Sequence, residues 1–183
     1  MDGLNYQHKS HYRIRSLDRF ITCRGFFYWW PMIQVWYDGA CGPNNPGGHA
    51  GSGISIKENN QIIYQESYYL GYGETMSNNV AEYLGVIRAL TYLLSIYKHN
   101  DKIVCYGDSK LTVMQMNKRW RCRKGLYKQY YLQACFLLKQ FKNISFIWIP
   151  RHQNEDADEL SKFAIETKSI SAYSPSYAPT CQV

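Results

Sequence analysis

Four acidic residues stand where a folded chain could bring them together around a metal ion. Asp38 follows an apolar, β-prone run, and Asp108 ends a second such run in CYGDSKL. Glu82 lies in the first turn of a predicted helix containing SNNVAEYLG, and Asp158 lies early in a helix containing EDADELSK. In α/β sheets, ligands bind at the carboxyl ends of parallel strands. We therefore expect the four carboxylates to share one crevice.

Each acid except Asp38 also has a purely structural explanation. A helix dipole favours Glu82 near a helix N-terminus, Asp108 can cap a helix, and Asp158 is one of several acids in its segment. Asp38 has no neutralising neighbour in the sequence. Four convergent carboxylates would repel one another without a cation, and their oxygens suit Mg²⁺ or Mn²⁺ better than zinc. Two such ions could activate a water and stabilise the leaving oxygen of a phosphoryl displacement.

The stretch from Val35 to Gly53, VWYDGACGPNNPGGHAGSG, surrounds Asp38 with glycines and prolines. Glycine allows a backbone to approach a phosphate chain closely, and Asn44 and Asn45 offer side-chain amides. A mononucleotide P-loop is the rival interpretation, but no Gly-Lys-Ser/Thr follows and the next predicted element is a strand. The stretch is therefore interpreted as a contact for a phosphate-containing substrate.

The elements that must position these acids alternate between strands and helices. Apolar and β-branched runs predict strands at 33–37, 52–57, 61–70, 103–106 and 144–149. Apolar residues at helical spacing predict helices at 79–97, 126–141 and 154–166, and a further helix that Asp108 or Ser109 caps and that ends near Asn117. This order predicts a mixed α/β sheet with an antiparallel start and right-handed crossovers.

The composition is that of a globular domain. The chain has 183 residues, of which 45% are hydrophobic and 19% charged, and this argues against a disordered protein. No apolar run approaches the roughly 18 residues of a membrane span, so no membrane partner is expected. A net charge of +7 is compatible with a polyanionic partner without proving one. Six cysteines without a CxxC pair or a preceding secretory signal favour free thiols and a cytoplasmic location over a disulfide framework.

The two ends of the chain differ from its middle. Residues 1–31 lack helical or strand periodicity and are interpreted as a poorly ordered extension, with a targeting peptide as the alternative. Residues 32–167 form the predicted folded domain, which is expected to be monomeric. Residues 168–183 contain two prolines and little charge, and they are interpreted as a flexible tail.

Four motifs in one order resemble the ribonuclease H family, type 1 class. They are the DGAC…NPGG loop, the SNNVAE helix start, the GDS strand end and the WIPRHQNEDADELS segment, and they span Ile33 to Ala164. The resemblance implies a five-stranded mixed sheet in the order 3-2-1-4-5 with helices on both faces. It also implies a metal-dependent endoribonuclease that hydrolyses the RNA strand of RNA–DNA hybrids with two Mg²⁺ ions, or Mn²⁺, leaving 5′-phosphate and 3′-hydroxyl ends.

The resemblance also assigns roles to single residues. Metal ligation is implied for Asp38, Glu82, Asp108 and Asp158, and assistance in proton transfer or product release for His152. Substrate contacts are implied for Cys41, Asn45, Ser77, Asn78 and Asn79. The asparagine pair at the helix start would read the minor groove, where a 2′-hydroxyl marks RNA. An extra loop residue leaves Asn44 as an alternative to Asn45, and Cys41 could equally be a small buried filler.

A short basic segment replaces the separate basic protrusion of some family members. It reads NKRWRCRKG, and its residues 118–124 are called the basic strip here. Arginine and lysine could contact phosphates and Trp120 a sugar, which makes Arg119, Trp120 and Arg121 candidate substrate contacts. A solvated linker between two helices is the alternative interpretation.

Two other functions remain open at this point. One is a hybrid-binding domain without catalysis, of reverse-transcriptase or mobile-element origin, but the presence of all four acids argues against it. The other is an integrase or transposase, which would lack the NNxAE helix start.

Overall fold

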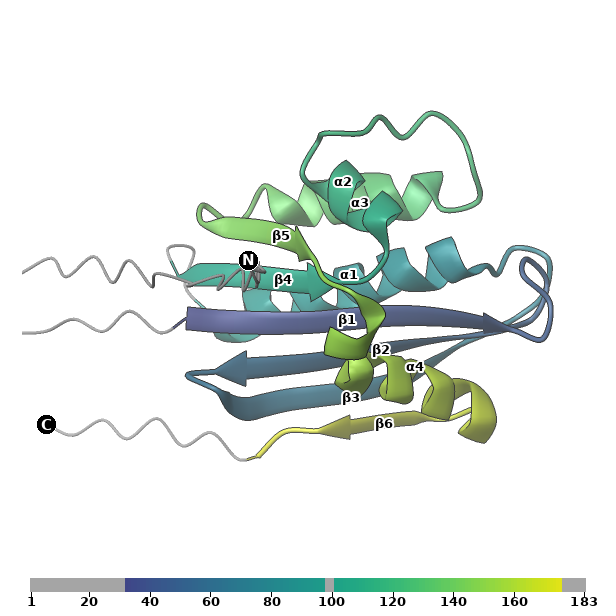
Figure 1. Cartoon of the computed structure of the whole chain (residues 1–183), viewed down its shortest axis with the longest axis horizontal. Coiled ribbons are helices and arrows are strands. Elements are labelled where there is room, and N and C mark those ends of the chain that lie inside the picture. Colours follow the sequence, from purple (N-terminus) through teal and green to yellow (C-terminus); the bar gives the residue numbers. More distant parts are fainter. Residues whose placement is uncertain (1–31, 98–100, 176–183) are drawn as a thin grey trace, which may run out of the picture.

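The computed structural model describes residues 32–97 and 101–175, in which helices cover both faces of one sheet (Figure 1). Within these residues the strands are β1 (Met32–Gly42), β2 (His49–Glu58), β3 (Gln61–Tyr72), β4 (Lys102–Gly107), β5 (Ile144–Trp148) and β6 (Ile170–Tyr173). The helices are α1 (Asn78–Ile96), α2 (Lys110–Met116), α3 (Lys128–Leu138) and α4 (Glu155–Thr167), with a 3-10 helix, η1 (Arg151–Gln153), before α4. The interpretation of residues 1–31 lies outside the described residues.

The strand order of the sheet is β5-β4-β1-β2-β3-β6. β1 pairs antiparallel with β2 and parallel with β4, and β4 pairs parallel with β5. The first five strands therefore have the order 3-2-1-4-5, and the predicted mixed α/β fold is confirmed.

β6 corrects the prediction of five strands and of a loose tail that begins at residue 168. Residues 170–173 pair antiparallel with residues 65–68 of β3. All four residues of β6 are exposed, so no alternation of buried and exposed side chains marks this strand in the sequence. Backbone pairing with the edge of β3 orders it instead. The rest of the predicted tail, from residue 176, lies outside the described residues.

The main core lies between the sheet and α1. Ser77 caps α1, because its hydroxyl accepts a hydrogen bond from the backbone N–H of Val80 at 3.3 Å. The apolar side of α1 then packs on β1 and β2. The buried side chains include Ile33, Val35, Tyr37, Ile54, Ile56, Tyr83, Val86, Leu90, Leu93 and Ile103. This packing fixes where α1 lies relative to the carboxyl end of β4.

Two glycines near Asp38 lie under helices. A Cβ atom on Gly39 would stand 2.1 Å from the backbone nitrogen of Glu82, and one on Gly53 would stand 2.1 Å from the carbonyl oxygen of Ala157. No side chain fits at either position, so glycine lets α1 and α4 approach the sheet closely. Helix packing therefore requires glycine at both positions, independently of any phosphate contact. The two glycines bring helices α1 and α4 close to Asp38.

Two further expectations concern thiols and membranes. Cys41, Cys105, Cys122 and Cys135 are free, as predicted, whereas Cys23 and Cys181 lie outside the described residues. Neither 32–97 nor 101–175 contains a helix that is both long and apolar enough to cross a membrane.

Candidate active site

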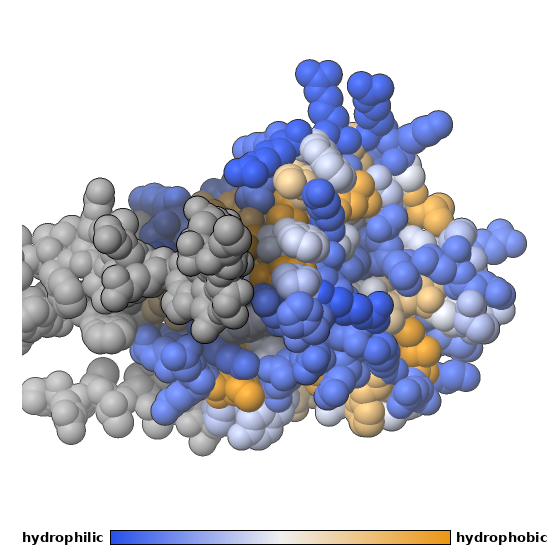
Figure 2. All heavy atoms as spheres, viewed as in Figure 1, coloured by the Kyte–Doolittle hydropathy of each residue, from blue (hydrophilic) through white to orange (hydrophobic). Residues whose placement is uncertain are grey.

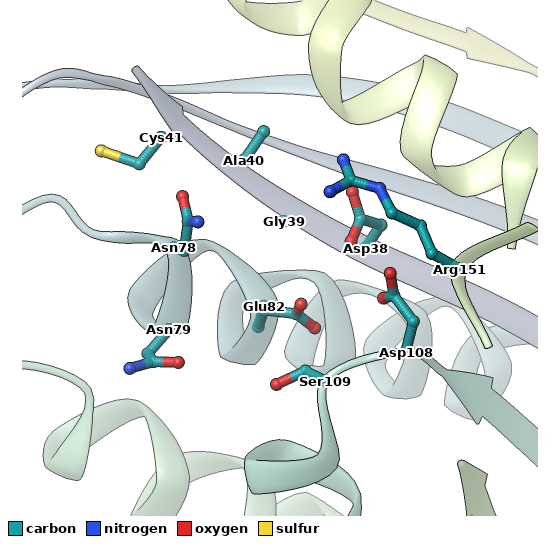
Figure 3. Close-up of a pocket in the computed structure, with 10 residues that line it drawn as sticks. All are labelled: Asp38, Gly39, Ala40, Cys41, Asn78, Asn79, Glu82, Asp108, Ser109 and Arg151. Carbon is teal, nitrogen blue, oxygen red and sulfur yellow. The ribbon is translucent and has the colours of Figure 1, made fainter. Parts of the chain in front are cut away.

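Three of the four predicted acids meet beside the carboxyl ends of the central strands. One carboxylate oxygen each from Asp38, Glu82 and Asp108 lies within 4.8 Å of the other two. Figure 3 shows these carboxylates directed toward one another from β1, α1 and the end of β4. They line a pocket of about 360 Å³, whose other lining residues are Gly39, Ala40, Cys41, Asn78, Asn79, Ser109 and Arg151. We call the three acids the acid cluster.

The acid cluster is short of positive charge. Asp38 is 5% exposed and Glu82 is 6% exposed. Burial, with added repulsion from Asp108, raises the pKa of Asp38 to about 6, although Ser161 donates a hydrogen bond to its Oδ2 at 2.6 Å. Burial, with repulsion from Asp38 and Asp108, also raises the pKa of Glu82. Within the described part of the chain, Oε2 of Glu82 has no hydrogen-bond partner.

These features fit a divalent cation with oxygen ligands. Buried carboxylate oxygens in folded proteins nearly always have a partner, so the unpaired oxygen of Glu82 indicates a missing ligand. Three carboxylates at such separations destabilise one another unless a cation compensates their charge. Cys41 lines the same pocket, but its thiol donates to the carbonyl oxygen of Asn44 at 3.2 Å. An all-carboxylate donor set suits Mg²⁺ or Mn²⁺.

The position of Glu82 in α1 corrects the sequence prediction. α1 begins at Asn78, so Glu82 is its fifth residue and lies beyond the first turn, which contains no acid. The helix dipole stabilises charge mainly within the first turn. The helix dipole therefore does not explain why an acid stands at position 82. Its place in the acid cluster is the explanation that is left.

Asp158 lies beside the acid cluster but is neutralised within its own chain. Both Arg151 and Lys162 donate hydrogen bonds to its carboxylate. Burial alone would raise the pKa of Asp158, but these two hydrogen bonds and the two positive charges outweigh it and lower the pKa. The Arg151 guanidinium is two-thirds exposed and lies across the pocket near Asp38 (Figure 3). The structure thus gathers three acids and pairs the fourth with cations.

The substrate contacts implied by the motif at the helix start lie at the same pocket. Asn78 and Asn79 line it, and Ser77 caps the helix that carries them. Oδ1 of Asn45 accepts a hydrogen bond from the backbone N–H of Asn78 at 3.0 Å. This contact joins the loop after β1 to the start of α1, and it is made by Asn45.

The remaining predicted residues lie outside the pocket. His152 is exposed in η1, next to Arg151. Arg119, Trp120 and Arg121 are exposed in the connection between α2 and α3. Figure 2 shows hydrophilic side chains projecting from the top of the molecule, where Figure 1 places this connection. The structure therefore presents the basic strip to solvent, outside the lining of the acid cluster.

Lys162 and three further residues that hydrogen-bond to the predicted acids, namely Arg151, Asn154 and Ser161, were not predicted as site residues. Asn154 is fully buried, and its Nδ2 donates to the carbonyl oxygen of Tyr37 at 3.0 Å and to Oδ1 of Asp108 at 3.2 Å. Arg151, Asn154 and Ser161 stand within WIPRHQNEDADELS, so this motif could have marked them. Which acid each one contacts depends on how η1 and α4 dock, and no spacing in the sequence reveals that.

Known sequences match most of the folded part of the chain. The family model described as "Reverse transcriptase-like" matches residues 36–164. The bifunctional protein Rv2228c of Mycobacterium tuberculosis is 31% identical over 134 residues, which are 73% of this chain and 35% of that protein. Ribonuclease HI of Halobacterium salinarum is 28% identical over 134 residues, which are 73% of this chain and 64% of that protein. The chain thus spans about a third of the length of its mycobacterial relative.

Solved structures match the same region. The N-terminal RNase H domain of Rv2228c superposes with a TM-score of 0.67 at 29% identity, covering 75% of this chain and 95% of that one. LC11-RNase H1, solved in complex with an RNA/DNA hybrid, also superposes with a TM-score of 0.67 at 29% identity, covering 74% of this chain and 98% of that one.

Proposed function

The chain belongs to the ribonuclease H family, type 1 class, and from this premise we propose that it is a metal-dependent endoribonuclease acting on RNA–DNA hybrids. It would cut the RNA strand and leave 5′-phosphate and 3′-hydroxyl ends. The acid cluster carries the proposal, because its buried, unpaired Glu82 oxygen and three adjacent carboxylates call for a cation. The likeness to LC11-RNase H1, a protein solved with a hybrid, supports the substrate.

Asp38, Glu82, Asp108 and Asp158 would hold two divalent cations, Mg²⁺ or Mn²⁺. When bound, two such ions activate a water and stabilise the leaving oxygen of an in-line phosphoryl displacement. The chain itself orients the ligands, since Ser161 holds Asp38 and Asn154 holds Asp108 by hydrogen bonds.

Residues at the rim of the pocket would bind the hybrid. Asn78 and Asn79 would contact the minor groove, where the 2′-hydroxyl distinguishes RNA from DNA. Asn45 and Ser77 would help to bind a phosphate of the DNA strand, and Cys41 would lie against the substrate at the end of β1. The hydrogen bond between Asn45 and the backbone of Asn78 supports this arrangement, because it holds the loop and the helix start together.

Two exposed groups would act at the edges of the substrate. His152 would accept or deliver a proton near the leaving group, or assist release of the product, from its position beside Arg151. The basic strip would bind phosphates through Arg119 and Arg121 and place Trp120 against a sugar. The exposure of these side chains supports both roles, since a substrate can reach them.

The proposal is tested with a labelled RNA–DNA hybrid incubated with Mg²⁺. We expect cleavage by the wild-type chain, and loss of cleavage with EDTA or with Asp38→Asn. Asp156→Asn is the control for the same change of side chain, because Asp156 is an exposed acid of α4 whose carboxylate accepts from Lys57 at 2.9 Å. It should cleave normally. Wild-type protein that binds the hybrid but does not cut it with Mg²⁺ or Mn²⁺ would instead support a hybrid-binding domain without catalysis.

A further inference from the structure

We propose that Tyr83 and Gln115 are positioning residues that hold the basic strip at a fixed place relative to the acid cluster. The inference rests on the proposed function, because it assigns the strip to hybrid binding. It concerns two side chains that touch neither the acid cluster nor the pocket, and that act through the backbone of the strip.

A chain of two hydrogen bonds links α1 to the basic strip. The hydroxyl of Tyr83 donates to Oε1 of Gln115 at 2.5 Å. Nε2 of the same Gln115 donates to the carbonyl oxygen of Arg121 at 3.3 Å. Tyr83 and Gln115 are both buried, so the oxygen and the nitrogen of the Gln115 amide form these hydrogen bonds shielded from water. Gln115 therefore bridges a helix of the core and the middle of the strip.

Local hydrogen bonds give the start of the strip its shape. The backbone N–H groups of Arg119 and Trp120 donate to the carbonyl oxygen of Met114 at 2.9 and 3.1 Å, and that of Lys118 donates to the carbonyl oxygen of Gln115 at 2.9 Å. All three bonds connect residues within six positions of one another at the end of α2. They set the turn, whereas the Gln115 side chain ties that turn to α1.

The ring of Tyr83 holds the other end of the same connection. Tyr127, the N-cap residue of α3, stacks on it with the ring centroids 5.5 Å apart and the planes at 10°. Tyr131 meets the ring edge-on at 5.9 Å and 80°. Tyr83 thus contacts α2 through its hydroxyl and α3 through its ring, and the basic strip lies between these two helices.

The same helix carries Tyr83 and the acid cluster. Tyr83 follows Glu82 directly in α1, and successive helical side chains point about 100° apart. One turn of α1 therefore presents Glu82 to the acid cluster and Tyr83 to Gln115. Figure 1 shows the connection between α2 and α3 above α1. Phosphate contacts assist a reaction only when their distance from the reacting group is fixed. Because α1 contacts both the acid cluster and the residues that hold the basic strip, it can fix that distance.

The alternative is that the pair merely satisfies two polar groups in the core. Tyr83→Phe separates the two explanations, because it removes the hydroxyl and keeps the ring that packs in the core. For cleavage of a labelled RNA–DNA hybrid with Mg²⁺, we expect KM to rise about three- to tenfold with kcat within about twofold. Gln115→Met should have the same effect. Tyr64→Phe is the matched control, since it removes a hydroxyl that donates to Glu66 at 2.9 Å, and it should leave KM unchanged.

A double-variant series shows whether the effect passes through the strip. In an Arg119→Ala, Trp120→Ala, Arg121→Ala background, Tyr83→Phe should cause no further rise in KM, because the contacts that it positions are gone. An equal rise in both backgrounds, or an unchanged KM in both Tyr83→Phe and Gln115→Met, would overturn the inference while leaving the proposed function intact. If the wild-type chain does not cleave at all, the proposed function fails instead. Fluorescence anisotropy in EDTA then measures the Kd for the hybrid. A raised Kd in Tyr83→Phe supports the inference, and an unchanged Kd overturns it.

Discussion

Two buried glutamates, one on β3 and one on α1, have opposite surroundings. Glu66 of β3 is 4% exposed and Glu82 of α1 is 6% exposed. Arg88 donates to both oxygens of Glu66, at 2.6 Å from Nε and 2.5 Å from Nη2, and the Tyr64 hydroxyl adds a third bond at 2.9 Å. Glu82 instead faces other carboxylates, and its Oε2 finds no partner in the part of the chain that the structure describes.

The difference separates a structural charge from a functional one. A buried carboxylate is strongly unfavourable unless a partner compensates it. Arg88 compensates Glu66 within the chain, so that pair belongs to the fold. Among residues 32–97 and 101–175, no cation forms an ion pair with Glu82, and burial with nearby negative charge raises its pKa. A bound cation would compensate Glu82, so the comparison favours a metal at this glutamate, whereas Glu66 needs none.

The largest expected effect comes from neutralising the uncompensated glutamate. Glu82→Gln should lower kcat for hybrid cleavage about a thousandfold, because it removes one of the proposed metal ligands. It should not lower the melting temperature, since it relieves repulsion from Asp38 and Asp108. Glu66→Gln is the control. It should keep the kcat of the wild-type chain at temperatures below the melting temperature of the variant. Equal losses of activity in the two variants would break the comparison.

The second expected effect is a dependence of stability on pH in metal-free protein. The pKa of Asp38 is about 6 in the folded chain against an ordinary value of 3.8, so the native state binds more protons than the unfolded state between these values. Stability should therefore fall as the pH rises from about 4 to about 6, by up to ~3 kcal/mol. Asp158 has a lowered pKa, so its contribution is lost only as the pH falls below about 4.

Melting curves in EDTA across this range test that prediction. Asp38→Asn should flatten the dependence, and Mg²⁺ at pH 7 should raise the melting temperature of the wild-type chain but much less that of the variant. A wild-type stability that rises with pH between 4 and 6 would contradict the assignment of Asp38 as an uncompensated buried acid.

The compensated glutamate should respond in the opposite way when its partner is removed. Arg88→Met leaves Glu66 buried with only the Tyr64 hydroxyl, and we expect the free energy of unfolding to fall by about 2 kcal/mol, less than for a fully buried pair because Arg88 is partly exposed. Urea denaturation measures this loss. Hybrid cleavage at a temperature at which the variant is folded should be unchanged, and a large drop in kcat would show that the pair also serves the site.

The comparison also shows what sequence can predict. Asp38 and Asp108 were predictable site residues because apolar runs mark the strands that carry or precede them, and the same periodicity predicted five strands and the helices. The end of β1 was placed wrongly, because β1 continues past Asp38 to Gly42, whereas Asp108 directly follows β4 as predicted. β6 was missed because its residues are all exposed and leave no apolar pattern. The pair of Glu66 and Arg88 was missed as well, since 22 residues separate a strand residue from its helical partner and neither stands in a motif.

The state of Asp158 could not be predicted for a related reason. The motif placed this acid at the site, but its charge depends on Arg151 and Lys162, which reach it only after η1 and α4 fold. A sequence shows that cations lie seven residues before and four residues after the acid. It does not show that both point at the same carboxylate, and this geometry decides whether the acid is available to a metal.

Asp158 is thus intermediate between the two glutamates, and the smallest expected effect tests how firmly its cations hold it. Lys162 is half exposed, so its bond to Asp158 is weak in the way of surface ion pairs. If Lys162 competes with a metal for this carboxylate, Lys162→Met should lower the Mg²⁺ concentration for half-maximal cleavage about two- to fivefold with little change in kcat. Lys57→Met removes a comparable cation from Asp156 of the same helix and should leave that concentration unchanged. A higher Mg²⁺ requirement in Lys162→Met would mean that the lysine orients Asp158 for the metal. Asp158 would then be grouped with Glu82, because its charge would serve the site and not the fold.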